Sequence, residues 1–130
     1  MTDRATYAKM KQLLTEKQPG QPLFVFDVTM QNHSGYANSY ANIHPEVTVQ
    51  GEGNSKRLSN YLSLLKVSDE ALAELISFVS TEIEEPTVIL FFGDHQPADI
   101  VVQSLYTAAG ADINDLTDQQ RSQRYVTPFY

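Results

Sequence analysis

Residues 86–97 read Pro-Thr-Val-Ile-Leu-Phe-Phe-Gly-Asp-His-Gln-Pro, and this stretch decides the expected fold. After its proline comes a continuous apolar run of β-branched and aromatic residues, the pattern of a strand buried on both faces. A similar run, residues 23–30, lies earlier in the chain. Strands of this kind occur in parallel sheets that are covered by helices. The sequence therefore predicts an α/β fold with a mostly parallel sheet flanked by helices.

The segments around these two runs have helical periodicity. Apolar residues spaced three and four positions apart indicate helices over residues 3–17 and residues 58–81, and the second pattern is the clearer one. A weaker pattern indicates a third helix over residues 100–109. Residues 125–130 are apolar and indicate a further strand. Strands that alternate with helices are typical of βαβ units.

Composition places the chain among globular proteins and excludes several function classes. It has 130 residues, of which 42% are hydrophobic and 19% charged, as expected for a single domain. The net charge of −7 argues against nucleic acid or an anionic membrane as the main partner. The sequence contains no cysteine, which excludes disulfides and thiolate metal sites. It also contains no apolar run of the ~20 residues that span a membrane.

The most informative polar residues are Asp94 and His95, which follow the second apolar run and Gly93. In open α/β sheets, ligands bind beyond the carboxyl ends of the strands. A carboxylate and an imidazole at such a bend can both reach one divalent cation, and they suit Mn²⁺, Zn²⁺ or Fe²⁺ better than Ca²⁺. The structural alternative is that Asp94 caps the next helix and His95 packs beside it. The residue pattern alone leaves both interpretations open.

His33 lies just beyond the end of the first apolar run. If the two strands are parallel, His33 and the Asp94–His95 pair open onto the same edge of the sheet. An imidazole there would bind an anion or protonate a leaving group. The alternative is a surface histidine that is hydrogen-bonded to its own turn. The neighbouring Ser34 lacks a Gly-x-Ser-x-Gly context, so we exclude it as a nucleophile.

Several stretches resemble one protein family. Residues 60–72, Asn-Tyr-Leu-Ser-Leu-Leu-Lys-Val-Ser-Asp-Glu-Ala-Leu, and residues 86–97 resemble the sulfatase and lipoteichoic acid synthase branch of the alkaline phosphatase superfamily. The form Phe-Gly-Asp-His-Gln-Pro is similar to the phosphoglycerol transferase type, whereas ordinary sulfatases usually have Ser-Asp-His-Gly. Residues 26–33 and 125–129 are similar to further strands of this family. The resemblance extends over residues 23–130.

This resemblance implies a role for each candidate residue. Asp94 and His95 would be metal ligands, and His33 would contact the phosphate or sulfate group of the substrate. The cofactor would be a divalent metal, with Mn²⁺ preferred and Mg²⁺, Zn²⁺ or Ca²⁺ as alternatives. The family's nucleophile, a Thr or a formylglycine, belongs to an N-terminal half, so no catalytic residue is assigned within this chain. Residues 1–130 would be a single fragment, the C-terminal part of a catalytic domain with a partial alkaline-phosphatase-like fold.

The implied function is that of a metal-dependent phosphoglycerol transferase or sulfatase-like enzyme in cell-envelope polymer metabolism. Its substrate would be a glycerophosphoryl lipid, a polymer or a sulfate ester, and nucleic acid is not expected as a partner. The full-length enzyme would have a membrane anchor and an extracellular catalytic domain. The fragment alone would be soluble and inactive, and would bind metal weakly because it supplies only two ligands.

An alternative function is a non-catalytic binding or assembly domain that retains the sulfatase-like fold. The lack of an assigned nucleophile is compatible with both functions. If the chain is half of a domain, the sheet edge where the missing strands should pair would be exposed and would favour self-association.

Overall fold

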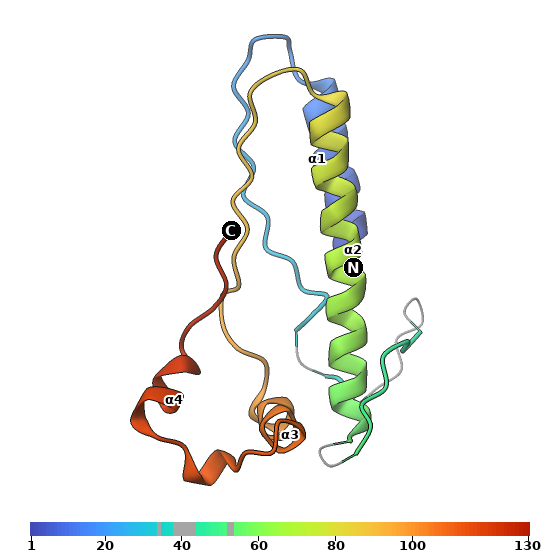
Figure 1. The fold of residues 1–130 in the computed structure, drawn as a ribbon. Coiled ribbons are helices and arrows are strands. Elements are labelled where there is room, and N and C mark those ends of the chain that lie inside the picture. Colours follow the sequence, from blue (N-terminus) through green and yellow to red (C-terminus); the bar gives the residue numbers. More distant parts are fainter. Residues whose placement is uncertain (34, 38–43, 52–53) are drawn as a thin grey trace. The chain divides into compact units, whose positions relative to one another are not determined.

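The computed structural model describes residues 1–33, 35–37, 44–51 and 54–130 (Figure 1). The chain divides into two compact units, which are described separately below: Met1–Asn32 with Leu64–Val88, and His33–Ser63 with Ile89–Tyr130. The helices are α1 (Asp3–Glu16), α2 (Lys56–Glu82), α3 (Asp99–Ala108) and α4 (Asp118–Gln123), with a short 3₁₀ helix η1 (Ile113–Asp115). The three helices predicted from periodicity are therefore confirmed. None of the described helices has the combined length and hydrophobicity that a membrane span requires.

The prediction of a mostly parallel sheet is wrong. Half of the structure is helical and only 2% is strand, and the described residues form no sheet. Residues 23–30 and 86–90 make no hydrogen bond to another backbone group in the described part of the chain. An isolated antiparallel bridge joins Phe92 to Phe129. A strand becomes part of a sheet only when a neighbouring strand exchanges backbone hydrogen bonds with it, and no such neighbour lies beside these segments among the described residues.

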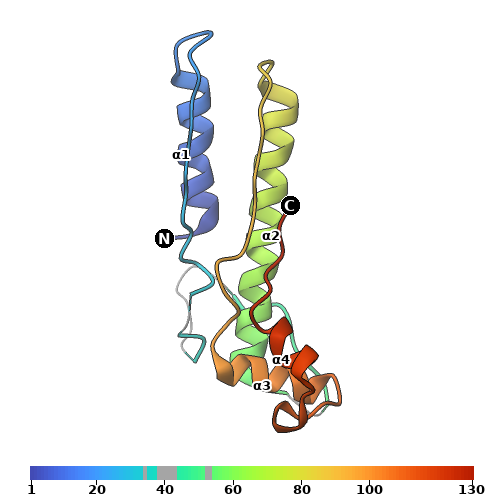
Figure 2. The ribbon, with the colours of Figure 1, turned by 90° about the vertical axis from the view of Figure 1, so that its left-hand side faces the viewer.

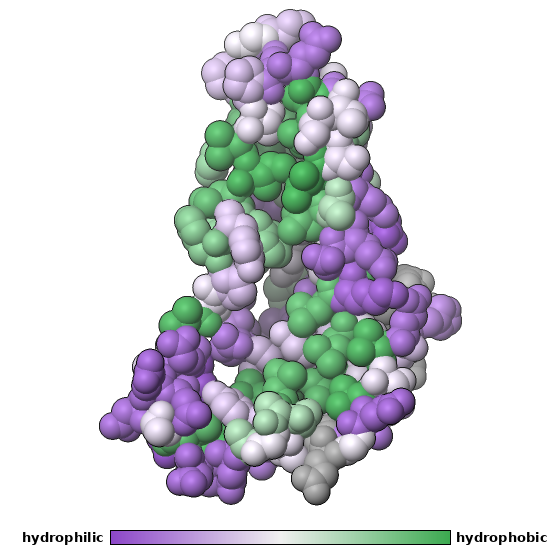
Figure 3. All heavy atoms as spheres, in the orientation of Figure 1, coloured by the Kyte–Doolittle hydropathy of each residue, from purple (hydrophilic) through white to green (hydrophobic). Residues whose placement is uncertain are grey.

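Without sheet partners, the apolar segment (residues 23–30) keeps its hydrophobic side chains at the surface. Phe24 is 89% exposed and Phe26 is 71% exposed, whereas Asp27 and Thr29 are half-buried. Figure 3 shows hydrophobic surface where this segment runs. The alternation of a strand is thus present in the side-chain exposure, but the burial on both faces that the sequence predicts is absent.

In the first unit, α1 packs along the C-terminal part of α2. Arg4 pairs with Glu74 at 2.8 Å, and Lys11 lies 5.4 Å from the centre of the Phe78 ring. These contacts follow the same order along both helices, so the helices run parallel (Figure 2). Their core contains Tyr7, Ala71 and Leu75, with Met10, Leu72 and Val79 packed against them. Burial raises the pKa of the Tyr7 hydroxyl to about 12, and the nearby carboxylates of Asp3 and Asp27 contribute.

A buried polar network joins the start of α1 to the middle of α2. The Ser68 hydroxyl donates to Asp3 Oδ2 at 2.5 Å and accepts from the side-chain amides of Gln31 and Asn32, each at 2.9 Å. Gln31 Oε1 in turn accepts from the Asp3 backbone N–H at 3.1 Å. Asp3 is 2% exposed and Gln31 is 7% exposed, so water does not replace a lost partner at low cost. Ser68 is therefore the centre of the network.

We expect Ser68→Ala to lower the free energy of unfolding by about 1–3 kcal/mol, because it removes the hydrogen-bond donor to the buried Asp3 carboxylate and leaves the Gln31 amide with only Leu64 O as acceptor. Urea unfolding followed by circular dichroism measures this loss. The matched control is Ser80→Ala on the same helix, where an exposed hydroxyl donates to Ile76 O at 2.9 Å. The control is expected to change stability by less than about 0.5 kcal/mol. Equal losses in the two variants would contradict the importance of the network.

Candidate metal-binding site

A short antiparallel pairing in the second unit positions the backbone just before Asp94. Phe91 and Tyr130 exchange two backbone hydrogen bonds, each 2.9 Å long. The Gly93 N–H then donates to Pro128 O at 3.2 Å. The C-terminal segment of the chain therefore holds the residue that precedes Asp94.

Thr127 makes a second attachment at Gly93. The Thr127 hydroxyl donates to Gly93 O at 2.7 Å. A Cβ atom on Gly93 would lie 3.3 Å from Cβ of Thr127, which is closer than most Cβ contacts. On the other side of the Asp94–His95 pair, the Gln96 amide donates to Val126 O at 2.6 Å. The small residue at position 93 thus permits the close approach of the two segments.

Asp94 and His95 are oriented by contacts with their own backbone. Asp94 Oδ1 accepts from the His95 N–H at 2.8 Å, and His95 Nδ1 lies 2.7 Å from Gln96 O. A carbonyl oxygen can only accept, so Nδ1 carries the proton and Nε2 of the neutral ring retains its lone pair. Nε2 lies 3.5 Å from Asp94 Oδ2. Both side chains are well exposed, at 65% for His95 and 77% for Asp94.

The two free atoms, Asp94 Oδ2 and His95 Nε2, fit a single divalent cation. Ligands that lie 2.0–2.1 Å from a tetrahedral cation are separated by about 3.4 Å, close to the 3.5 Å observed. A hydrogen bond from the other ring nitrogen to a carbonyl is the usual support of a metal-binding histidine. The pair alone does not complete a coordination shell. Within the described residues, no group of three or more His, Cys, Asp or Glu side chains is arranged to hold a metal.

The alternative in which Asp94 caps the following helix is not what the structure shows. α3 begins after Ala98, and no side chain makes a capping hydrogen bond there. Asp94 instead accepts from its neighbour His95, and the acidic residue in the first turn of α3, Asp99, pairs with Arg124. The Asp94 carboxylate is therefore not required to cap α3.

His33 lies in the same unit as Asp94 and His95. The expected parallel sheet was the reason to place all three at one edge, and that reason is lost because the described residues form no sheet. The contact between His33 and a substrate anion stays a prediction, as do the ligand roles of Asp94 and His95. Ser34, which we excluded as a nucleophile, lies outside the described residues.

Sequence reasoning missed the residues that support the pair. Thr127 and Gln96 each bond to a carbonyl more than 25 positions away, at 34 and 30 residues respectively. No motif in the sequence encodes such a partner. A prediction that residues 125–130 pair with the apolar run before Asp94 (residues 87–92) would have located Thr127 and Gln96.

The chain was compared with protein families, curated proteins and solved structures. A family model described as Sulfatase matches residues 1–123, which is nearly the whole chain. No curated protein matches the chain, and no solved structure does.

If Asp94 and His95 are the ligands, Mn²⁺ added to the isotope-labelled chain is expected to broaden the NMR signals of Gly93–Gln96 first, because these residues would lie nearest to the paramagnetic ion. The affinity should be weak, since two ligands hold metal poorly. Asp94→Asn should weaken binding by more than about tenfold, because it removes a charge and a direct ligand. His33→Ala should leave binding unchanged.

The matched control for this titration is Asp112→Asn. Asp112 lies in the same unit, and its carboxylate accepts from the Asn114 N–H at 2.8 Å. Broadening that is the same in the wild type and in Asp94→Asn would remove Asp94 from the ligand set.

Proposed function

Because the chain belongs to the sulfatase family, we propose that it is the C-terminal part of the catalytic domain of a metal-dependent enzyme that acts on sulfate esters or phosphodiesters. The observation that carries the proposal is the 3.5 Å spacing of Asp94 Oδ2 and His95 Nε2 within a chain that matches this family. The Phe-Gly-Asp-His-Gln-Pro form of residues 92–97 supports phosphoglycerol transfer over sulfate hydrolysis.

In this proposal, Asp94 and His95 supply two ligands of the metal site, and Mn²⁺ is the preferred ion. A divalent ion bound there supplies positive charge for the ester oxygen and for the activation of a nucleophile. The Gln96 carbonyl keeps the His95 ring oriented, and Thr127 holds the backbone at Gly93. His33 contacts the oxygens of the sulfate or phosphate group. The nucleophile and the remaining ligands belong to a longer protein.

The substrate class follows from the same resemblance. We propose a glycerophosphoryl lipid, a polymer or a sulfate ester of the cell envelope. The longer protein would be anchored in the cell membrane with its catalytic domain outside the cell. The chain has a net charge of −7, so its surface as a whole repels an anionic substrate. This supports recognition of the substrate at a small cationic site rather than over a broad charged surface.

The chain alone, supplied with Mn²⁺, is expected to show no turnover of 4-nitrophenyl sulfate or bis(4-nitrophenyl) phosphate, because loss of a nucleophile removes orders of magnitude of rate. The protein from the whole reading frame that contains this sequence is expected to hydrolyse one of them. Asp94→Asn in that protein should lower kcat/KM by more than about 100-fold, and Asp112→Asn is the control. Turnover by the chain alone that Asp94→Asn abolishes would overturn the fragment proposal, and full activity of the variant would overturn the enzyme proposal.

The alternative, a non-catalytic assembly domain, is favoured by one observation: the exposed apolar side chains of residues 23–30. Phe24 is 89% exposed, Phe26 71%, Val28 60% and Met30 59%. Contiguous apolar side chains that are exposed in this way mark a surface at which a partner binds.

The apolar segment (residues 23–30) is the part of this surface best suited to pair with a second copy. Its backbone forms no hydrogen bond to another backbone group within the described residues, and Phe24, Phe26, Val28 and Met30 are exposed. When two copies of this segment pair antiparallel with Phe26 at the centre, the apolar face of one copy lies on the same side as the apolar face of the other. A pair centred on Asp27 would set two carboxylates opposite each other and is disfavoured. We therefore propose self-association with Phe26 at the two-fold axis.

Phe26→Lys is expected to shift the chain towards the monomer in sedimentation equilibrium, because it places two like charges opposite each other at the axis. The control is Tyr125→Lys, which adds the same charge at a side chain that is 90% exposed in the other unit. A wild-type chain that stays monomeric at all concentrations would rule out self-association. An equal shift in both variants would rule out this segment as its site.

A further inference from the structure

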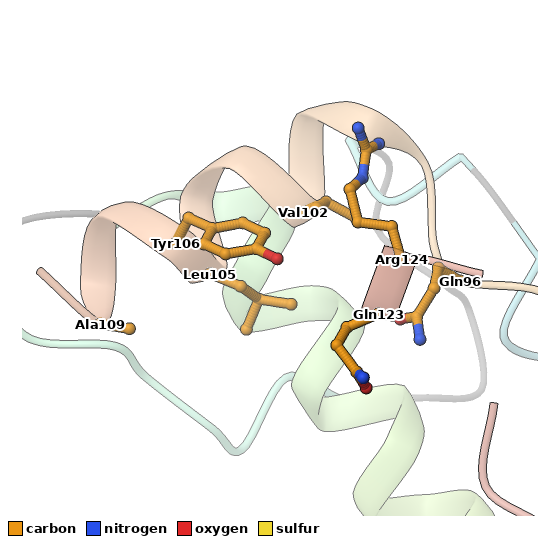
Figure 4. A pocket seen from close by; sticks show the side chains of 7 residues that line it. All are labelled: Gln96, Val102, Leu105, Tyr106, Ala109, Gln123 and Arg124. Carbon is orange, nitrogen blue, oxygen red and sulfur yellow. The ribbon is translucent and has the colours of Figure 1, made fainter. Parts of the chain in front are cut away.

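The second unit contains a pocket of about 280 Å³ beside α3, and no role has been assigned to it so far (Figure 4). Its floor is apolar and consists of Val102, Leu105 and Ala109, which are on or just after α3. Val102 is only 6% exposed, whereas Leu105 is 36% exposed and Ala109 is also exposed, so this floor presents apolar surface to a ligand. The size is near the lower end for ligand pockets in proteins, which run from about 300 Å³. It suits a single ring better than a long chain.

Polar groups surround this apolar floor. Tyr106, Gln96 and Gln123 line the pocket, and Figure 4 shows the hydroxyl end of Tyr106 directed towards the side that Gln123 and Arg124 form. In the described part of the chain, neither the Tyr106 hydroxyl nor the Gln123 amide makes a hydrogen bond. Gln96 Nε2 donates to Val126 O, which leaves its Oε1 as an acceptor. The pocket therefore offers several unused donors and acceptors.

The charge at this pocket is balanced. Among the described residues that line it, Arg124 is the one that carries a charge, and its guanidinium pairs with Asp99. An anionic group would compete with that carboxylate, in a chain whose net charge is −7. The part of a ligand that enters the pocket is therefore uncharged.

We propose that this pocket, the α3 pocket, binds a neutral saccharide unit that forms the alcohol part of the ester substrate. This deepens the proposed function and rests on it. A pyranose ring has an apolar C–H face that would lie on the Tyr106 ring and the aliphatic floor. Its neighbouring hydroxyls each donate and accept, which matches the acceptor Gln96 Oε1 and the donor and acceptor of the Gln123 amide.

Other neutral ligands fit less well. An acyl chain would cover the Gln123 amide and the Tyr106 hydroxyl without replacing their hydrogen bonds to water, which is unfavourable. A glycerol unit alone has no extended apolar face for the Tyr106 ring. The saccharide is the class that uses both the apolar floor and the polar rim.

The position of the pocket connects it to the candidate metal site. Gln96 lines the pocket and directly follows His95, whose ring is oriented by the Gln96 carbonyl. A saccharide in the α3 pocket thus lies next to the pair that we assign to the reacting ester. Gln96 links the two, since its carbonyl orients the imidazole and its side chain lines the pocket.

NMR titration of the metal-free chain with methyl glycosides tests the pocket separately from metal binding and catalysis. We expect saturable shifts at Tyr106, Ala109 and Gln123 with a millimolar Kd. Tyr106→Ala should raise the Kd about five- to tenfold through the loss of ring stacking, and Gln123→Ala should raise it as well. Gln119→Ala in α4 is the control and should change nothing, and circular dichroism should confirm that each variant is folded.

Shifts that appear with hexanol or with inorganic phosphate but not with glycosides would overturn the assignment. So would glycoside shifts that survive both Tyr106→Ala and Gln123→Ala. Asp94→Asn should leave glycoside binding intact. If glycosides bind to the α3 pocket while the longer protein lacks esterase activity, the pocket assignment holds and the proposed enzyme function fails.

Discussion

An extended backbone needs hydrogen-bond partners outside its own segment, and the rest of the structure depends on this constraint. A helix satisfies its own N–H and C=O groups, so α1, α2 and α3 form from local sequence. A strand satisfies none of them until a neighbour arrives. Residues 23–30 remain extended and exposed for this reason, whereas Phe91 finds Tyr130 and makes two backbone hydrogen bonds. That pairing is what places Asp94.

This difference between helices and strands decides which parts of the fold could be predicted from the sequence. Helical periodicity is local, and it located three helices to within a few residues. The sheet required pairing between distant segments, which alternation and β propensity do not specify. The adjacency of Asp94 and His95 is evident in the sequence, but the attachment of Gly93 to Thr127 is not. Nothing in the sequence marks Ser68 as a network residue, yet its hydroxyl donates to buried Asp3 because α1 packs against that side of α2.

The functional account combines three observations of different kinds. Family membership gives the class of enzyme and the expectation of a metal. The geometry at His95 gives a free Nε2 lone pair 3.5 Å from a carboxylate oxygen, with the opposite ring nitrogen held by a carbonyl. The α3 pocket has an apolar floor and a polar rim, and it includes Gln96, the residue that follows that pair. The second and third share Gln96, so the orientation of the imidazole and the shape of the pocket are coupled through one residue.

The central claim is that His95 Nε2 and Asp94 Oδ2 bind one divalent cation together. Electron spin-echo envelope modulation of Mn²⁺ bound to the chain tests this directly, because the method detects nitrogen coupled to the metal. The account predicts an imidazole nitrogen signal that disappears in His95→Ala and persists in His33→Ala. A Mn²⁺ signal without nitrogen coupling in the wild-type chain, or one that is unchanged in His95→Ala, would contradict it.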